Sequence, residues 1–410
     1  MEVFHMENAK KYFRDEDEEH IVMLRHELHR HPELETDLPE TCAIVKKELS
    51  DLGIPYSLRY AKSGIVGYIN YPTEGYEEVP GKGMPGHVFT IGLRADMDAL
   101  PITEATGLPY SSTHPGIMHA CGHDAHTAML LGAARALKRA EKEGVLKIRI
   151  KLFFQPNEEG KGLGAGLFVE SGALSDVDLI FGQHISNDVP TGELQWHRGP
   201  FQAACFAYTI LFRGRSSHAT TPQFAHDALS MAVKAVNDIY LMNSREISPF
   251  KNRIISVGSL HAGTAHNIIA SEAEIQISFR FYDDDVRELV DRRIRQICQN
   301  AAEELSGEVE ITLDQSADPV INDDYATDKV IEAQRMIVPE EKISEAYMRM
   351  GSEDFSLYQR VCPGSFSRIG TGNPEKGCTG SAHNADLVLD EAAFLTGAMY
   401  LAQLGMLEYN

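Results

Sequence analysis

The sequence is short of basic residues, with 38 Lys and Arg against 60 Asp and Glu in 410 residues and a formal net charge of −22. So acidic a surface repels phosphate backbones and anionic lipid headgroups, which argues against nucleic-acid binding and membrane binding. No apolar run reaches the roughly 20 residues that span a bilayer. The longest run, 392–407, is interrupted by Thr396, Gly397, Gln403 and Gly405, and we expect it to form a buried C-terminal helix.

Cysteine is also sparse, with six residues scattered along the chain. Disulfide frameworks are typical of small secreted domains with closely spaced cysteines, so this spacing favours reduced thiols. Residues 1–19 are rich in acidic residues and do not show the basic-then-apolar layout of a secretory signal. From these features we expect a cytoplasmic protein.

The residues that are present indicate a folded chain of more than one domain. A content of 43% hydrophobic and 24% charged residues is typical of globular proteins, and 410 residues exceed one usual domain. Strands expected at 87–93, 147–154 and 177–182 alternate with helices, of which the longest is expected at 124–142. This alternation predicts an α/β fold, with a mainly parallel sheet and helices on both faces.

The pattern changes after Trp196. Strands are expected at 203–212, 254–260, 272–281 and 309–313, with helices at 227–241 and 286–305, and the order βαββαβ is that of a ferredoxin-like unit. We therefore expect a discontinuous domain at 1–198 and 316–410, interrupted by an inserted domain at 199–315. We expect the strand with Phe206, Tyr208, Ile210 and Phe212 to be an outer strand, which a partner subunit could cover.

Residues able to bind metal gather where predicted strands end. They are Asp96, Asp98, Cys121, His123, Glu158, Glu159, His184 and His383. In open α/β sheets, ligands bind beyond the carboxyl ends of the strands, so we expect these segments to converge. A thiolate, three imidazoles and one glutamate suit first-row metals such as zinc, manganese, cobalt or nickel. Five ligands exceed one tetrahedral site, which favours two ions sharing a ligand, as in two-metal hydrolases.

Each of these residues has a simpler interpretation when taken alone. A single cytosolic cysteine is more often a small buried hydrophobe, and a single histidine more often belongs to the core or surface. Of the adjacent Glu158 and Glu159, one can bind metal while the other acts as general base toward water. A solvated acidic turn explains the same pair equally well.

Several ordered motifs resemble a known family. They are HRHPE at 29–33, RADMD at 94–98, HACGHDAH at 119–126, FQPNEE at 154–159, GQH at 182–184, GTAHN at 263–267 and GSEDF at 351–355. Together they resemble the M20 metallopeptidases, over about residues 21–400. The nearest resemblance is to the amidohydrolase branch, which contains aminoacylases, hippurate hydrolases and indole-acetyl-amino-acid hydrolases.

The resemblance implies a zinc-exopeptidase-like catalytic domain, with the inserted domain as a lid that mediates dimerisation. It implies that two divalent ions are held by Cys121, His123, Glu159, His184 and His383. It further implies Glu158 as the general base and Asp96 as a support behind the metals. In the lid, His218 matches the histidine that stabilises the oxyanion in a neighbouring subunit's site. Asn267 and Arg280 match positions that hold the substrate's carboxylate.

The three lid residues also have structural interpretations. His218 can be an exposed turn residue, and Asn267 a turn cap. Arg280 can form an ion pair with Asp283 or Asp284.

We therefore predict a metal-dependent amidohydrolase that acts as a homodimer or higher homo-oligomer. It would cleave N-acyl amino acids, with acetyl or aromatic acyl groups, to a carboxylate and a free amino acid through a metal-activated water. A dipeptidase, carboxypeptidase or N-carbamoyl-amino-acid hydrolase using the same metals is the rival within the family.

Two rivals come from other classes. The glycines at 160–165 nearly spell a dinucleotide-binding fingerprint, although Glu158 and Glu159 would repel a pyrophosphate. The other rival is a catalytically silent, metal-stabilised binding protein.

Overall fold

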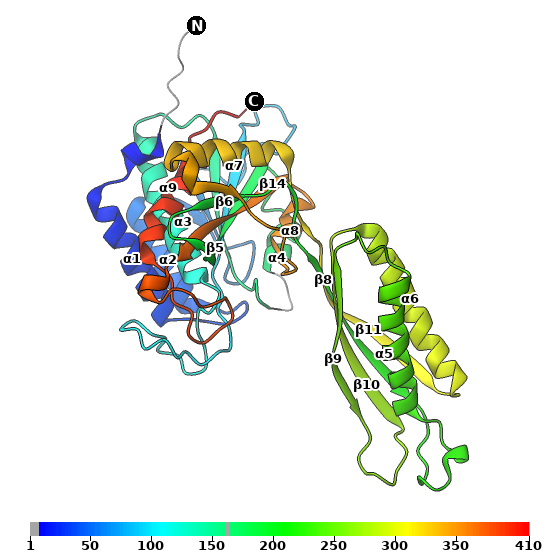
Figure 1. Cartoon of the computed structure of the whole chain (residues 1–410). Helices are drawn as coiled ribbons and strands as arrows, with labels where there is room; N and C mark the ends of the chain where they lie inside the picture. The colour runs from blue at the N-terminus through cyan, green and yellow to red at the C-terminus, as the bar shows by residue number, and fades with distance from the viewer. Residues whose placement is uncertain (1–7, 161–163, 410) are drawn as a thin grey trace. The chain divides into compact units, whose positions relative to one another are not determined.

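A computed structural model describes residues 8–160 and 164–409 of the chain. The chain forms two compact units (Figure 1). Unit 1 comprises Met1–Phe201, Ile321–Tyr347 and Asp354–Asn410, and unit 2 comprises Gln202–Val320 and Met348–Glu353. Short strands β7 (Gly199–Gln202) and β12 (Val320–Asn322) lie where the chain passes between the units. Unit 2 is therefore inserted into unit 1.

In the described residues, unit 1 is built on an eight-stranded sheet with the order β1-β2-β4-β3-β5-β14-β6-β13. Neighbours in the centre, β4 with β3, β3 with β5 and β5 with β14, are parallel, whereas β1 and β2 are antiparallel additions at one edge. The strands span Tyr56–Ser57 (β1), Ile65–Ile69 (β2), Thr90–Asp96 (β3), Arg149–Gln155 (β4), Leu179–Pro190 (β5), Leu194–Trp196 (β6), Ile343–Glu345 (β13) and Gly364–Gly372 (β14). The predicted mainly parallel α/β sheet is confirmed.

Helices cover both faces of this sheet. One face carries α1 (Asp15–Arg30), α2 (Pro39–Leu52), α3 (His123–Lys142), α7 (Asp324–Ile337) and α9 (Phe394–Leu404). The other carries α4 (Gly164–Glu170) and α8 (Phe355–Gln359). Side chains alternate along β4. Phe154 belongs to the core beneath α3, whereas the ring of Phe153 contacts Phe168 of α4 and Tyr358 of α8, with centroids 5.7 and 6.0 Å apart.

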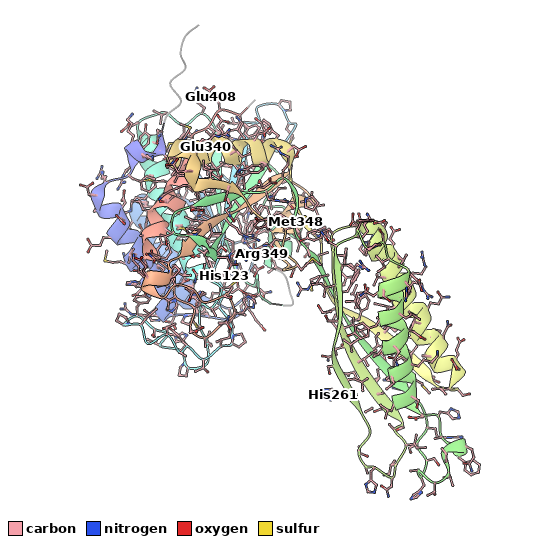
Figure 2. The ribbon with its side chains drawn as sticks, viewed as in Figure 1. His123, His261, Glu340, Met348, Arg349 and Glu408 are labelled. Carbon is pink, nitrogen blue, oxygen red and sulfur yellow. The ribbon has the colours of Figure 1, made fainter. Side chains whose placement is uncertain are left out.

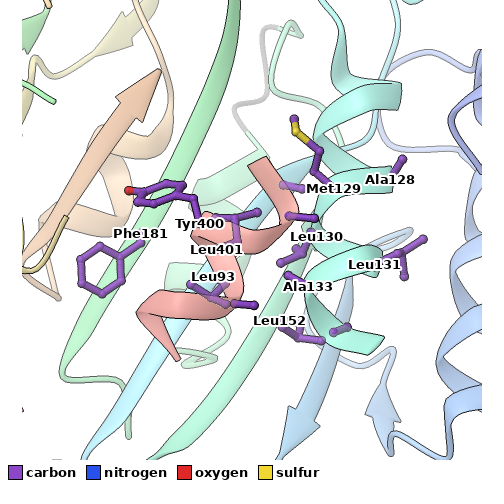
Figure 3. Packing of buried hydrophobic residues seen from close by; sticks show 14 of the residues in the cluster. Leu93, Ala128, Met129, Leu130, Leu131, Ala133, Leu152, Phe181, Tyr400 and Leu401 are labelled. Atoms are coloured by element: carbon purple, nitrogen blue, oxygen red, sulfur yellow. The ribbon is translucent and has the colours of Figure 1, made fainter. Parts of the chain in front are cut away.

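The core of unit 1 centres on α3. Figure 3 shows Leu130 and Ala133 of α3 beside Leu93 and Leu152 of the sheet and Leu401 of α9. Alanine is frequent along α3, and these small side chains let α1, α9 and the sheet approach it from different sides. The helix therefore has a firm position, which matters because its first residue is His123.

Unit 2 is a βαββαβ unit. Its elements are β8 (Ala204–Arg213), α5 (Ala228–Arg245), β9 (Arg253–Ala262), β10 (Glu272–Phe281), α6 (Asp284–Glu304) and β11 (Glu308–Ala317). Figure 1 shows α5 and α6 on one face of the sheet. Every second residue of β10, from Ala273 to Phe281, is buried under these helices, while Gln276 and Arg280 lie on the other face. This is the ferredoxin-like arrangement that the sequence predicts.

One expectation for unit 2 is wrong. The strand order is β11-β8-β10-β9, so β8 is an inner strand that pairs with β11 on one side and β10 on the other. Its side chains Phe206, Tyr208, Ile210 and Phe212 are buried in the unit's own core. The edges are β9, which carries the His261 labelled in Figure 2, and β11. The chain itself therefore covers the strand that we expected a partner to cover.

The C-terminal apolar run forms helix α9, whose side chains are largely buried. Its position in the core explains why the run is apolar without the length of a membrane span. Among the described residues, no helix combines the length and the apolar character needed to cross a membrane. All six cysteines lie in the described ranges, where they are free and buried.

Candidate metal centre and active site

The turn between β3 and α3 brings Cys121 and His123 to the site. Gly122 caps α3 with a φ of 85°, which is costly for any residue with a Cβ atom. A Cβ at this position would also lie 2.6 Å from Cγ1 of Ile185. The glycine thus allows a sharp turn in a crowded place, and both flanking side chains are buried.

The imidazole of His123 has one satisfied and one unsatisfied nitrogen. Its Nδ1 lies 2.9 Å from the carbonyl oxygen of Asp98, which can only accept, so Nδ1 is the donor. Nε2 is buried and makes no hydrogen bond, and it lies 4.0 Å from carboxylate oxygens of both Glu158 and Glu159. A backbone carbonyl behind one nitrogen, with the other turned toward carboxylates, is the usual arrangement of a metal-binding histidine.

His184 lies within β5 rather than after it. The pairing of β5 with β14 includes His184, which lies opposite Arg368. Its Nδ1 donates to the carbonyl of Ile185 at 2.7 Å, and its Nε2 lies 3.4 Å from Sγ of Cys121. Burial, followed by the neighbouring His126, holds the pKa of His184 well below its usual value. The ring is therefore neutral, with a lone pair directed at the thiol.

Glu159 and His383 complete the centre. The two side chains approach to 3.1 Å between Oε1 and Nε2, and Oε1 is buried without a hydrogen bond. His383 is held by its backbone N–H, which donates to the carbonyl of Ala120 at 2.7 Å, and its φ of 67° is uncommon for a histidine. The neighbouring Cys121 and Glu159 raise the pKa of His383 to about 10.

Asp98 holds the two glutamates in place, a role that the sequence did not predict. Its Oδ1 accepts the backbone N–H of Glu158 at 2.9 Å, and its Oδ2 accepts that of Glu159 at 3.0 Å. The side chain is 1% exposed, so neither bond competes with water. The spacing of two carboxylates in RADMD is the only signal in the sequence, and it does not indicate which of them accepts backbone hydrogen bonds.

Asp96 lies behind the centre, as the last residue of β3 rather than a residue after the strand. Its carboxylate accepts hydrogen bonds from Arg94 Nη1 and His126 Nδ1, both at 2.6 Å. Burial would raise the pKa of Asp96, but His123, Arg94 and His126 hold it well below its usual range. His126 Nε2 accepts the N–H of Ile185 at 3.0 Å, so His126 has no lone pair left for a metal.

The donor set fits divalent metal. One ligand atom each from Cys121, His123 and His184 lies within 4.8 Å of the others, and the same holds for Cys121, Glu159 and His383. Burial would lower the pKa of His123, yet Asp96 and Asp98 hold it well above its usual value, so the centre attracts positive charge. Burial and Glu159 raise the pKa of the Cys121 thiol, and a bound cation would reverse that effect.

Unit 2 brings two of the predicted lid residues together. His218 and Ile268 form a β-bridge, and the N–H of Ala219 donates to the carbonyl of Asn267 at 3.0 Å. His218 is exposed, and its Nδ1 accepts the N–H of Thr220 at 3.2 Å, which leaves the proton on Nε2. The outward nitrogen of His218 is therefore a donor.

Arg280 lies at the other end of β10. Its Nη1 donates to Oγ of Ser352 at 2.9 Å, whereas Asp283 pairs with Lys251 and Asp284 with Arg287. Eight residues separate Glu272 from Arg280 along β10, and a strand rises about 3.4 Å per residue. Within one chain, Arg280 is thus roughly 27 Å from the end of β10 that adjoins Asn267.

Part of the glycine-rich segment at 160–165, residues 161–163, lies outside the described residues. The rest does not resemble the start of a dinucleotide-binding helix. α4 is short, and the N–H of Ala165 donates to Oδ2 of Asp354 at 2.9 Å. A buried carboxylate therefore occupies the position that a phosphate would need.

Sequence comparison identifies the class. A sequence model described as "Peptidase family M20/M25/M40" matches residues 92–406. The chain belongs to this family of metal-dependent hydrolases, as the motifs and the metal-type donor set predict.

Individual relatives place the chain within the family. It is 34% identical over 391 residues to "Thermostable carboxypeptidase 1" of Saccharolobus solfataricus, covering 95% of each chain. It is 33% identical over 384 residues to "N-acetyl-L-cysteine deacetylase" of Bacillus subtilis, covering 94% of this chain and 87% of that one. A solved dinuclear metal binding M20 peptidase of Bacillus subtilis superposes with a TM-score of 0.78 at 28% identity, covering 96% and 98% of the two chains. The resemblance to the amidohydrolase branch is consistent with these relatives.

Proposed function

We propose that the chain is an amidohydrolase that cleaves N-acyl amino acids, with acetyl or aromatic acyl groups, in the cytoplasm. The observation that carries this proposal is the convergence of buried atoms without hydrogen bonds, His123 Nε2 and Glu159 Oε1, beside Glu158. Such atoms are costly to bury unless a cation binds them. The relative named as a deacetylase acts on a small N-acyl amino acid, which supports the substrate class.

Two divalent ions are proposed, zinc or manganese, with cobalt or nickel as alternatives. The ligands would be Cys121, His123, Glu159, His184 and His383. Two groups of three ligands share Cys121, and the solved relative is named as dinuclear, which supports two ions rather than one. Bound ions of this kind supply Lewis acidity, which polarises a carbonyl group and lowers the pKa of water.

Glu158 is the proposed general base. Asp98 fixes its backbone, and its carboxylate lies 4.0 Å from His123 Nε2, at the edge of the ligand set. In this position it can take a proton from the attacking water and later give it to the nitrogen of the departing amine. Asp96 positions His126 and shields the centre from behind, without touching substrate.

We propose a homodimer, or a higher homo-oligomer, and the positions of the lid residues support it. Arg280 and Asn267 cannot hold one substrate carboxylate from the same chain, because β10 separates them by roughly 27 Å. We propose that Arg280, whose planar guanidinium suits a carboxylate, and Asn267 contact the substrate from two different chains. His218 and Asn267, which lie together, would reach the site of a second copy, with His218 Nε2 donating to the oxyanion.

Glu158→Gln tests the general base. The variant should keep its metal content, because the amide retains shape and Glu159 remains, while turnover of N-acetyl amino acids falls about 100- to 10,000-fold. Glu193→Gln, at a half-buried glutamate elsewhere in unit 1, is the matched control and should be unaffected. Full metal content with wild-type turnover in Glu158→Gln would overturn the assignment, and a wild-type chain without chelator-sensitive hydrolysis would indicate a silent binding protein.

The second candidate is a carboxypeptidase or dipeptidase. It is favoured by the relatives named as thermostable carboxypeptidases, which match 95% of this chain. Both activities cleave an amide next to a free carboxylate, so the metal centre does not separate them. A panel of N-acetyl, aromatic acyl, dipeptide and N-carbamoyl substrates, compared by kcat/KM, does.

A further inference from the structure

A second cluster of metal-type ligands lies in unit 1, apart from the proposed catalytic residues. It consists of His31, directly after α1, Glu40, in the first turn of α2, and His114, in the loop between β3 and α3. Oε2 of Glu40 is 2.6 Å from Nδ1 of His31, and Oε1 is 3.3 Å from Nε2 of His114. One ligand atom from each residue lies within 4.8 Å of the other two.

One of the facing atoms of this cluster makes no hydrogen bond. Nδ1 of His114 lies 2.9 Å from the carbonyl oxygen of Pro32, so Nδ1 carries a proton, and in the neutral ring the lone pair is on Nε2, the nitrogen that faces Glu40. Nδ1 of His31 is buried and forms no hydrogen bond despite its closeness to Glu40. A neutral imidazole whose lone pair faces a carboxylate is repelled by it, and a cation bound by both groups removes that repulsion.

The backbone around each ligand is held by hydrogen bonds. Glu33 accepts the N–H groups of Glu40 and Thr41, at 3.1 and 2.9 Å, and so fixes the start of α2. Both N–H and Oγ1 of Thr113 donate to the carbonyl of Arg30, which ties the loop next to His114 to the end of α1. A carbonyl behind a histidine and fixed ligand backbones are features of built metal sites.

We propose that His31 Nδ1, His114 Nε2 and the Glu40 carboxylate form a further site for a divalent first-row metal ion such as zinc. Two imidazoles and one carboxylate suit such an ion, with water in the remaining position. Exposures of 29% for each histidine and 48% for the glutamate leave a path for the ion. The ion would join the α1–α2 junction to the loop that leads to Cys121, so its role is to hold that loop.

Zinc stoichiometry tests the site. Wild-type chain is stripped with a chelator, equilibrated with Zn2+ buffered at micromolar free concentration, and analysed for zinc per chain by mass spectrometry. The double variant His31→Gln/His114→Gln should hold one zinc fewer than wild type. Because only the difference is read, the outcome does not depend on the number of ions in the proposed catalytic centre or on hydrolytic activity.

His87→Gln is the matched control. His87 Nδ1 also faces a proline carbonyl, that of Pro80 at 3.3 Å, and its Nε2 faces a carboxylate, that of Asp178 at 2.7 Å, which also accepts the N–H of Thr90. This variant should bind as much zinc as wild type. Equal zinc in wild type and the double variant, or an equal loss in His87→Gln, would overturn the site.

Glu40→Gln gives an independent reading, because a half-exposed, near-isosteric change does not threaten folding. It should lose the same zinc equivalent as the double variant, and zinc should raise its melting temperature less than that of wild type. Retention of the full zinc content by Glu40→Gln would refute the proposal even if the histidine variant failed to fold.

Discussion

The variant Asp98→Asn tests whether Asp98 positions the two glutamates for catalysis or only stabilises the fold. Both carboxylate oxygens of Asp98 accept hydrogen bonds, from the N–H groups of Glu158 and Glu159. An asparagine side chain has a single oxygen on this side and can accept only one of these two hydrogen bonds. The other N–H would face an NH2 group in a buried place, at a cost of about 1–3 kcal/mol. The variant should therefore melt several degrees lower than wild type.

The catalytic effect should be larger than the loss of stability suggests. A displacement of about 1 Å at a reacting group can lower the rate about 100-fold, so kcat should fall by that order while KM changes little. The measurements are initial rates at saturating and limiting substrate, together with metal content and thermal unfolding.

Asp178→Asn is the control for this effect. Asp178 also accepts a backbone N–H, that of Thr90 at 2.8 Å, but at the amino ends of β3 and β5. A seven-residue strand at about 3.3 Å per residue places it roughly 20 Å from the site. It should lose stability and keep kcat. A retained kcat in Asp98→Asn, with the same loss of stability as the control, would refute the positioning role.

Three further predictions concern the turn, the lid and the response to acid. Gly122→Ala should lower both metal content and melting temperature, because its φ of 85° and the 2.6 Å approach to Ile185 leave no room for a Cβ; unchanged metal content would contradict this. Arg280→Met should raise KM for N-acyl amino acids about 10- to 100-fold, the loss of a charged hydrogen bond, but not for their methyl esters; equal effects on both substrates would exclude a carboxylate contact. Although burial opposes the shift, hydrogen bonds from His29, Thr106 and the Ser112 N–H lower the pKa of Glu104 from 4.5 to about 2. Ionised Glu104 thus stabilises the fold above pH 4.5 and loses this effect as the pH falls toward 2, so the destabilisation by Glu104→Gln, measured by urea unfolding with a chelator present, should shrink over that interval.

Local patterns predicted the secondary structure well where the signal is itself local. Pro39 begins α2 and Gly53 ends it with a φ of 67°, because proline suits a first helical turn and glycine a left-handed cap. The strand expected at 272–281 has the same bounds in the structure, since its side chains alternate strictly between buried and open faces.

Predictions that depended on pairing between distant segments were less successful. The apolar side chains of β8 suggested an exposed edge, but whether a strand lies at an edge depends on which strands pair with it. β11 is about a hundred residues away in sequence, and its register with β8 leaves no local trace. In the same way, pairing with β14 extends β5 past His184, so the strand ends later than its apolar run.

In the candidate site, too, local sequence signals were informative and contacts between distant segments were not predicted. Residue types and strand ends were enough to nominate Cys121, His123 and one glutamate of the pair Glu158 and Glu159, because few other functions require a thiol, an imidazole and a carboxylate at one edge of a sheet. They could not identify Asp98, whose partners are backbone N–H groups that every residue except proline possesses. Nor could they find His31 and His114, which meet only because the loop packs against the end of α1.

The residues behind the centre explain why the site needs cations. Arg94 is the buried partner of two carboxylates at once, Asp96 at 2.6 Å and Asp354 at 2.9 Å, so one positive charge is shared by two negative ones. Gln155 adds neutral hydrogen bonds to Asp354 at 2.8 and 2.9 Å, which orient that carboxylate without neutralising it. The interior therefore faces His123 with an excess of negative charge, which accounts for the raised pKa of that imidazole. Because a proton and a metal ion compete for the same lone pair of His123, the network that raises this pKa also strengthens the binding of a divalent cation.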